Sequence, residues 1–163
     1  MSTKFYYVLF NLMDDIAPYK ESYKERLEIS RLNRELSTNS SKQTLTIEDM
    51  DLMSGHEFEK AIANIFEKMN YKVVLTPATK DQGVDIIAEK GTMRLGIQTK
   101  CYTGKVGNSA IQEIVAGKNY YQLSRCMVVT NSTFTTSAIE LAKVNNVILW
   151  DRNILIEKIN SYD

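Results

Sequence analysis

Residues 81–102 have the sequence DQGVDIIAEKGTMRLGIQTKCY, in which two apolar runs flank the dipeptide Lys90–Gly91. Short runs rich in aliphatic residues on either side of a turn signal predict an antiparallel β-hairpin. Each run also contains polar side chains, Asp85 in the first and Gln98 and Lys100 in the second. The interpretation of the whole chain depends on why a hairpin would carry these groups.

Side chains alternate between the two faces of a strand, so each polar residue can be assigned to a face. In the first run Asp85 shares a face with Ile87, and the opposite face carries Val84, Ile86 and Ala88. In the second run Gly96, Gln98 and Lys100 share a face. With the turn at its centre, the hairpin places Asp85 across from Gln98. The pattern fits an ordinary solvated face, and it fits a site that needs a carboxylate, an amide and an ammonium together.

The sequence on either side of the hairpin alternates between helical and strand patterns. Ser54 and Glu57 have the spacing of a capping box, and apolar residues at helical spacing follow them up to Met69. Ser109 and Gln112 have the same spacing at the start of a second expected helix. In all, strand patterns cover residues 71–76, 84–89, 93–102, 125–130 and 147–151. After the first helix, helical patterns cover residues 108–123, 135–146 and 152–160. The order αβββαβαβα predicts an α/β fold with a mixed central sheet flanked by helices.

The composition predicts an ordinary globular protein. Of 163 residues, 44% are hydrophobic and 25% are charged, and no apolar run approaches the length of a membrane span. No signal peptide is recognisable, so we expect a cytoplasmic protein. Cys101 and Cys126 lie in apolar runs and are expected to be reduced, packed thiols. We expect residues 1–50 to form a helical extension and linker and residues 51–163 to form the main domain.

The charge is unevenly distributed along the chain, although the formal net charge is zero. A neutral sum argues against coating of nucleic acid by bulk electrostatics. From Lys90 to Arg125, however, the sequence contains six basic residues and a single acidic residue, Glu113. This basic excess surrounds the hairpin, so a surface that faces phosphate is consistent with the sequence.

Five segments between residues 52 and 157 carry a resemblance to a known family. In chain order they are GHEFEKAIANIFEKMNYKVV, DQGVD, IQTKCY, TNSTFTTSAIELA and VILWD. Together they resemble the catalytic domain of the Mrr-like restriction endonucleases, in the PD-(D/E)XK nuclease superfamily. The resemblance implies a restriction-endonuclease-like αβββαβ core and metal-dependent hydrolysis of DNA phosphodiester bonds, as in a type IV restriction enzyme.

The resemblance also implies roles for individual residues of the hairpin and the preceding helix. Asp85 is expected to bind Mg²⁺, with Mn²⁺ as a substitute, and Lys100 to orient or deprotonate the attacking water and neutralise charge. Gln98 stands where many superfamily members have an acidic residue, so its amide oxygen is expected to bind the metal with one negative charge fewer. Glu59 is expected to supply the missing carboxylate. Gly83 is expected to give the backbone conformation that precedes Asp85.

The expected partner is DNA. Lys105, Lys118 and Arg125 are candidate phosphate contacts, and Gln112 is a candidate for the edge of the site. A homodimer and an additional specificity or regulatory partner are further expectations. Two alternatives remain open from the sequence: a structure-selective nuclease similar to a Holliday junction resolvase, and a nuclease-fold module that binds DNA or protein without cutting. Gln98 is the residue that keeps the second alternative open.

Overall fold

The computed structural model describes residue 28, residues 45–77 and residues 82–162. The chain divides into two units, Met1–Gln43 and Thr44–Asp163. The first unit is described only at Glu28, an exposed helical residue. The extension and linker expected over residues 1–50 therefore lie largely outside the described residues. The second unit begins at Thr44, ahead of the expected boundary at residue 51.

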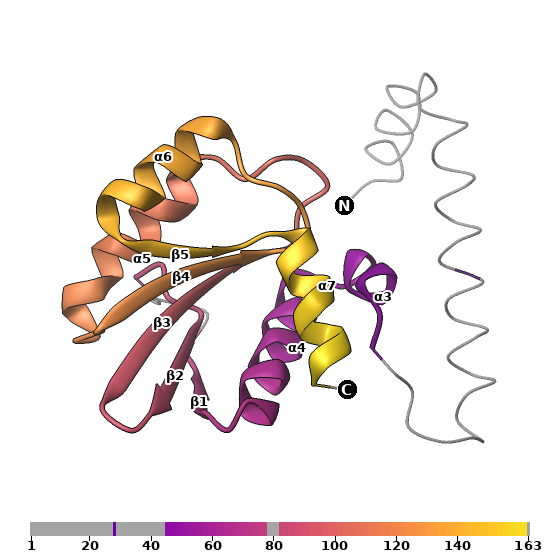
Figure 1. Ribbon diagram of the computed structural model, residues 1–163, viewed down its shortest axis with the longest axis horizontal. Helices are drawn as coiled ribbons and strands as arrows, with labels where there is room; N and C mark the ends of the chain where they lie inside the picture. The colour runs from indigo at the N-terminus through magenta and orange to yellow at the C-terminus, as the bar shows by residue number, and fades with distance from the viewer. Residues whose placement is uncertain (1–27, 29–44, 78–81, 163) are drawn as a thin grey trace, which may run out of the picture. The chain divides into compact units, whose positions relative to one another are not determined.

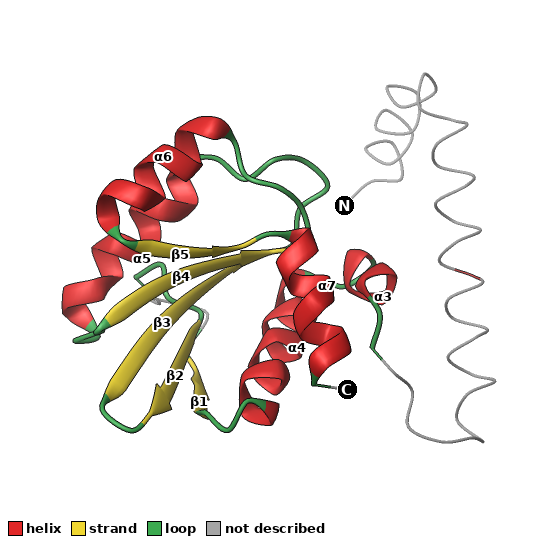
Figure 2. Cartoon of the chain, in the orientation of Figure 1, coloured by secondary structure: helices red, strands yellow, loops and turns green. Residues whose placement is uncertain are grey.

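Within its described residues, the unit Thr44–Asp163 has a five-stranded sheet between two layers of helices (Figure 1 and Figure 2). In their order across the sheet, the strands are β1 (Lys72–Leu75), β2 (Ile86–Lys90), β3 (Met93–Lys100), β4 (Arg125–Thr130) and β5 (Val147–Trp150). The helices are α3 (Ile47–Asp51), α4 (Gly55–Lys68), α5 (Asn108–Tyr120), α6 (Thr136–Asn145) and α7 (Arg152–Ser161). From α4 onward, the predicted order αβββαβαβα is confirmed.

The sheet is mixed, as the order of elements predicted. Strands β1, β2 and β3 pair in antiparallel fashion, whereas β4 and β5 continue the sheet in parallel. In the hairpin, Lys90 pairs with Met93 and Ile86 pairs with Ile97. The predicted hairpin is therefore confirmed, and its register holds from Ile86 to Lys90, whereas Asp85, expected opposite Gln98, precedes the first paired residue.

Each face of the sheet packs against its own helices. On one face α4 and α7 cover the sheet, with Phe58, Ile62 and Phe66 of α4 and Leu155 of α7 in the core. The short helix α3 adds two buried side chains, Ile47 and Met50, to the same core. On the other face α5 and α6 pack against the sheet through Ile111, Ile114, Ala138 and Ala142. The helix α3 was not predicted.

The strand alternation expected for residues 84–88 is wrong at its first residue. Ile86 and Ala88 face α4, but Val84 packs with Ile87 on the α5 side. The reason lies in the backbone before β2, where Gly83 has a positive φ of 76°. In addition, the Asp85 N–H donates to the Ile97 carbonyl at 2.9 Å, one residue out of step with the register of the strands. Regular alternation therefore starts only at Ile86.

The helix starts are confirmed in one case and corrected in another. Ser54 caps α4, and its N–H donates to Glu57 Oε2 at 2.9 Å in the predicted capping box. The capping box expected at Ser109 and Gln112 is wrong, because α5 begins at Asn108 and its capping position is Gly107, which has no side chain to accept a hydrogen bond. Both cysteines are free thiols, as predicted. Among the described residues, no helix combines the length and apolar character needed to cross a bilayer.

Candidate active site

Asp85 is held at the end of the hairpin by Thr99 on the neighbouring strand. The backbone N–H of Thr99 donates to Asp85 Oδ2 at 2.6 Å, and its hydroxyl donates to the same oxygen at 3.0 Å. No hydrogen bond within the described part of the chain reaches the other oxygen, Oδ1. The carboxylate is thus fixed in orientation through one of its oxygens.

Gln98 and Lys100 are held by Glu113 of helix α5, on the opposite face of the sheet from α4. The Gln98 amide nitrogen donates to Glu113 Oε2 at 2.7 Å, and the Lys100 ammonium lies 2.9 Å from the same oxygen. Burial acts to raise the pKa of Glu113, but the hydrogen bonds from Lys100 and Gln98 and the charge of Lys100 outweigh it and lower the pKa overall. Glu113 is therefore an ionised acceptor that joins Gln98 and Lys100, the two polar residues of the Gln98-Thr99-Lys100 (QxK) motif on β3.

Glu59 lies near Asp85 and brings a second carboxylate to it. Burial raises the pKa of Asp85 above its usual range, and the charge of Glu59 raises it further. The hydrogen bonds from Thr99 and the positive charge of Lys100 lower it without offsetting the burial. Glu59 also contacts the exposed His56, whose Nδ1 lies 3.2 Å from Glu59 Oε2. The surroundings of Asp85 therefore favour an added positive charge.

The amide oxygen of Gln98 is buried and lacks a hydrogen-bond partner. Gln98 is 4% exposed, and its Oε1 is the only buried side-chain oxygen without a partner among the residues that the structure describes. Leaving a buried acceptor unpaired costs about 1–3 kcal/mol, so an orphaned oxygen in a polar site calls for an explanation. A divalent cation that prefers oxygen ligands would provide that partner.

The donor set decides whether such a cation fits the site. No group of three His, Cys, Asp or Glu side chains able to hold a metal occurs within the described ranges. A site here therefore requires the Gln98 amide oxygen beside the carboxylates of Asp85 and Glu59. Such a set suits Mg²⁺, which binds few protein ligands and retains several waters. The residues fit the ion, provided that the amide takes part.

Gly83 lies where no other residue fits easily. Its φ of 76° falls in the left-handed region, and a Cβ atom there would lie 2.6 Å from the backbone carbonyl of Glu113. The turn before Asp85 therefore packs directly on α5 at the residue that binds Gln98 and Lys100.

The candidate DNA contacts divide between the two ends of the sheet. Lys105, in the loop between β3 and α5, and Gln112, on α5, are exposed near the end of β3 that carries Lys100. Arg125 pairs with Leu95, at the other end of β3, roughly 17 Å from Lys100 along the strand. Lys118 in the last turn of α5 lies near Cys126, at that same far end.

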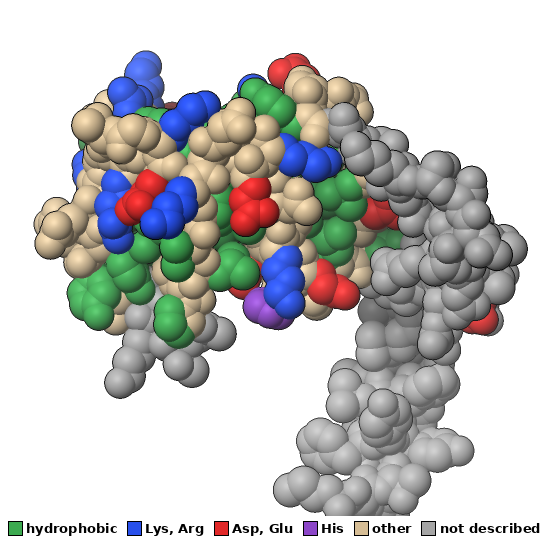
Figure 3. All heavy atoms as spheres, turned by 90° about the horizontal axis from the view of Figure 1, so that it is seen from below, with side chains coloured by type: hydrophobic (Ala, Val, Ile, Leu, Met, Phe, Trp, Pro, Cys, Tyr) green, Lys and Arg blue, Asp and Glu red, His purple; other side chains and the backbone are tan. Residues whose placement is uncertain are grey.

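The charged side chains do not form a single basic patch on the face shown in Figure 3. Lys and Arg side chains there are separated by acidic, apolar and other groups. Binding of DNA through this face would depend on individual contacts rather than on a continuous basic surface.

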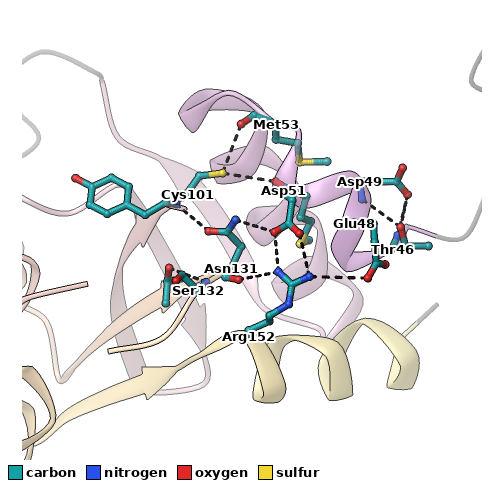
Figure 4. Close-up of polar contacts among 12 residues, drawn as sticks. Thr46, Glu48, Asp49, Asp51, Met53, Cys101, Asn131, Ser132 and Arg152 are labelled. Atoms are coloured by element: carbon teal, nitrogen blue, oxygen red, sulfur yellow. Dashed lines mark hydrogen bonds and ion pairs between the residues drawn. The ribbon is translucent and has the colours of Figure 1, made fainter. Parts of the chain in front are cut away.

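A polar network that the sequence did not predict joins the end of β3 to helices α3 and α7 (Figure 4). Arg152 makes a two-pronged ion pair with Asp51, at 2.7 Å and 2.9 Å. Asn131 donates to Asp51 Oδ1 at 2.9 Å and accepts the N–H of Tyr102 at 2.8 Å. The segment that follows Lys100 is thereby anchored to the two helices.

Glu113 is the residue of the site that sequence reasoning missed. In the sequence it stands out only as the single acid of a basic segment. It follows Ile111 by two residues and precedes Ile114 by one, and since both are buried it lies beside the face of the helix that packs on the sheet. The signal that could have identified Glu113 was its position as a lone acidic residue next to the buried face of the helix that follows β3.

Comparisons with known proteins establish the family. A family model described as a restriction endonuclease, Mrr_cat, matches residues 50–159. Because this match spans well over half of the chain, the protein belongs to this restriction endonuclease family, a class of DNA endonucleases. The fold class predicted from the sequence is confirmed by the same match and by the similar structures below.

Solved structures similar to the chain include the following two. One is a protein of unknown function, AF1548, with a TM-score of 0.55, and the match covers 66% of this chain and 67% of that one. The other is the DNA modification-dependent restriction endonuclease AspBHI, with a TM-score of 0.57, and the match covers 75% of this chain but 40% of that one. Each is 16% identical in sequence, a level at which the likeness establishes the shared fold alone. No curated protein gives a significant match.

Proposed function

We propose that the protein is a Mg²⁺-dependent endonuclease that hydrolyses phosphodiester bonds of DNA at the site formed by Asp85, Gln98, Lys100 and Glu59. The observation that carries the proposal is the orphaned amide oxygen of Gln98, which is buried on β3 one residue away from Thr99, the residue that holds Asp85. A buried amide oxygen without a partner and a desolvated carboxylate are each costly unless a cation binds them.

Each residue has a separate task in the proposed site. Asp85, held by Thr99, presents its carboxylate in a fixed orientation, and the Gln98 oxygen and Glu59 complete the proposed protein ligands. Bound Mg²⁺ would polarise the scissile phosphate and lower the pKa of a water molecule. The Lys100 ammonium, paired with Glu113 in the free protein, supplies a positive charge where negative charge develops on the phosphate.

The substrate preference is proposed to be modified DNA, as in type IV restriction enzymes. The support is the fold shared with AspBHI, which is described as DNA modification-dependent. AspBHI is much longer than the matched part, so its recognition of modified DNA can reside outside the shared fold. The additional specificity or regulatory partner expected from the sequence belongs to this part of the proposal, as does a homodimer that places two sites on opposite strands.

The test is the conversion of supercoiled plasmid to nicked and linear forms, with methylated and unmethylated DNA, in Mg²⁺, Mn²⁺ or EDTA. Cutting that requires a divalent cation and is lost in Asp85→Ala and Lys100→Ala would support the proposal. Cleavage of four-way junctions but of neither plasmid would favour the resolvase alternative. A folded protein that binds DNA and cuts none of these substrates would leave a binding module as the function.

A further inference from the structure

Glu113 contacts both polar residues of the QxK motif through one oxygen. Glu113 Oε2 accepts the Gln98 amide N–H at 2.7 Å and pairs with the Lys100 ammonium at 2.9 Å. Gln98 lies on the central strand β3, and Glu113 comes from helix α5 that packs on the same strand. The helix therefore reaches the site through this single carboxylate.

The contact with Glu113 determines which end of the Gln98 amide faces the rest of the site. An amide has an acceptor end and a donor end, and an ionised carboxylate can only accept hydrogen bonds. The NH₂ end must therefore face Glu113, and Oε1 must face away from it, where it is buried and without a partner. A flipped amide would place two acceptors against each other and would present N–H groups, which cannot bind a cation.

We infer that Glu113 is a positioning residue that holds the Gln98 amide with its oxygen available to the metal ion. The inference rests on the proposed function and extends it to a residue outside the hairpin. It also explains how a Gln can replace an acidic residue in such a site, because the fixed amide presents an oxygen as a carboxylate would. The sole cost is one negative charge at the metal.

The backbone around Glu113 allows its side chain to be tested separately. Gly83 packs against the backbone and Cβ of Glu113, and these atoms are the same in Glu and Gln. Glu113→Gln therefore keeps the packing of the turn before Asp85 and changes only the group that Gln98 and Lys100 contact. Glu140, exposed on α6, offers the same substitution away from the site.

The decisive experiment exchanges the amide and the carboxylate between positions 98 and 113. The set consists of wild type, E113Q, Q98E and the double variant, with E140Q as the control. The readouts are binding of Mn²⁺ alone, from loss of the free-ion EPR signal, and the Mn²⁺ concentration that gives half-maximal plasmid nicking. Thermal unfolding of each variant in EDTA identifies any that do not fold.

The inference predicts an effect of E113Q that depends on the side chain at position 98. With the native Gln98 present, the substitution should weaken Mn²⁺ binding about 10–100-fold, the usual effect of losing a partner that orients a metal ligand. In the Q98E background, the side chain at position 98 ends in two oxygens, and the amide that E113Q introduces can donate a hydrogen bond to one of them. The substitution should then leave Mn²⁺ binding unchanged or strengthen it.

The outcomes separate this inference from the proposed function. Equal weakening in both backgrounds would mean that Glu113 does not act through Gln98, and an unchanged E113Q would remove its role altogether. Either result overturns the inference while a wild type that binds Mn²⁺ and nicks DNA keeps the proposed function. A wild type that neither binds Mn²⁺ nor nicks plasmid would overturn both.

Discussion

Asp85 is the residue at which the demands of stability and of the proposed chemistry differ most. Its carboxylate is buried enough to raise its pKa, and the neighbouring carboxylate of Glu59 adds to the unfavourable charge. Thr99 supplies hydrogen bonds that an uncharged amide could also accept. The proposed cation site is therefore electrostatically strained when no cation is bound.

Asp85→Asn is expected to stabilise the protein in EDTA at neutral pH, by about 0.5–1 kcal/mol, because it removes a desolvated charge and retains an acceptor for Thr99. Thermal unfolding measures this gain. Added Mg²⁺ should stabilise the wild type by mass action and should have little effect on the variant. A variant less stable than the wild type in EDTA would contradict this account of the Asp85 environment.

Gly83→Ala is expected to destabilise the protein by about 2–4 kcal/mol, since the new Cβ would meet the Glu113 carbonyl and the residue would keep a positive φ. Gly104→Ala is the matched control, because a Cβ there meets nothing within 4 Å and its φ is not positive. Urea denaturation of both variants tests the difference. Equal stabilities would show that the turn at Gly83 can relax away from α5.

At the scale of helices and strands, the sequence was sufficient wherever periodicity extended over several residues. The pattern of apolar residues in residues 54–69 predicted α4, and the two runs around Lys90 and Gly91 predicted the hairpin with its register. Sequence reasoning failed for α3, whose five residues make little more than one turn and therefore cannot repeat a helical period. The expected alternation of side chains failed at Val84 because it holds only where strands pair regularly, and regular pairing starts at Ile86.

The candidate site was predictable only in part for a related reason. Alternation along β3 was enough to put Gln98 and Lys100 on one face, where both contact Glu113. Asp85 precedes β2 and makes an irregular step in the pairing, which alternation could not predict. Glu113 and Thr99 hold these residues through contacts between elements, and no local pattern encodes such contacts. The roles assigned to the site residues remain predictions until the variants are assayed.

The ion pair between Asp51 and Arg152 connects α3 to α7 and is expected to stabilise the fold. Replacing either residue with Ala should cost about 1–3 kcal/mol, because the two-pronged pair is only partly exposed. A double-mutant cycle in urea should give a coupling of about 1 kcal/mol. The Glu89–Arg94 pair, which has a single contact and a more exposed arginine, is the control and should show a smaller coupling. Equal couplings would assign the Asp51 pair no special structural role.

For the molecule as a whole, the compact unit starts earlier than the sequence predicted. A fragment of residues 44–163 should unfold cooperatively, since the unit has its own two hydrophobic cores. A fragment that begins at Met53 should lose roughly 3–6 kcal/mol, because it lacks the buried side chains of Ile47 and Met50. Calorimetry of the two fragments makes the comparison. Similar stabilities would place the functional boundary at residue 51 after all.

The neutral net charge of the whole chain predicts that DNA binding depends on few contacts. Lys105→Ala, near the proposed site, should weaken plasmid nicking. It should also reduce the slope of log K for DNA binding against log salt concentration by about one, as expected for one lost phosphate contact. Arg125→Ala, at the far end of the sheet, is the comparison and should change nicking less. Fluorescence anisotropy across a salt series measures the slopes, and a larger effect of Arg125 would relocate the path of the duplex.

The ion pair between Asp51 and Arg152 also has a consequence for the order of events during synthesis. The two partners are 101 residues apart, and they anchor the segment that follows Lys100 through Asn131. A chain emerging from the ribosome therefore completes its hairpin early, but the ion pair between Asp51 and Arg152 cannot form until α7 has been made. The end of β3 that carries Lys100 is fully anchored only after that helix, so a nascent chain would reach the geometry of the candidate active site only then.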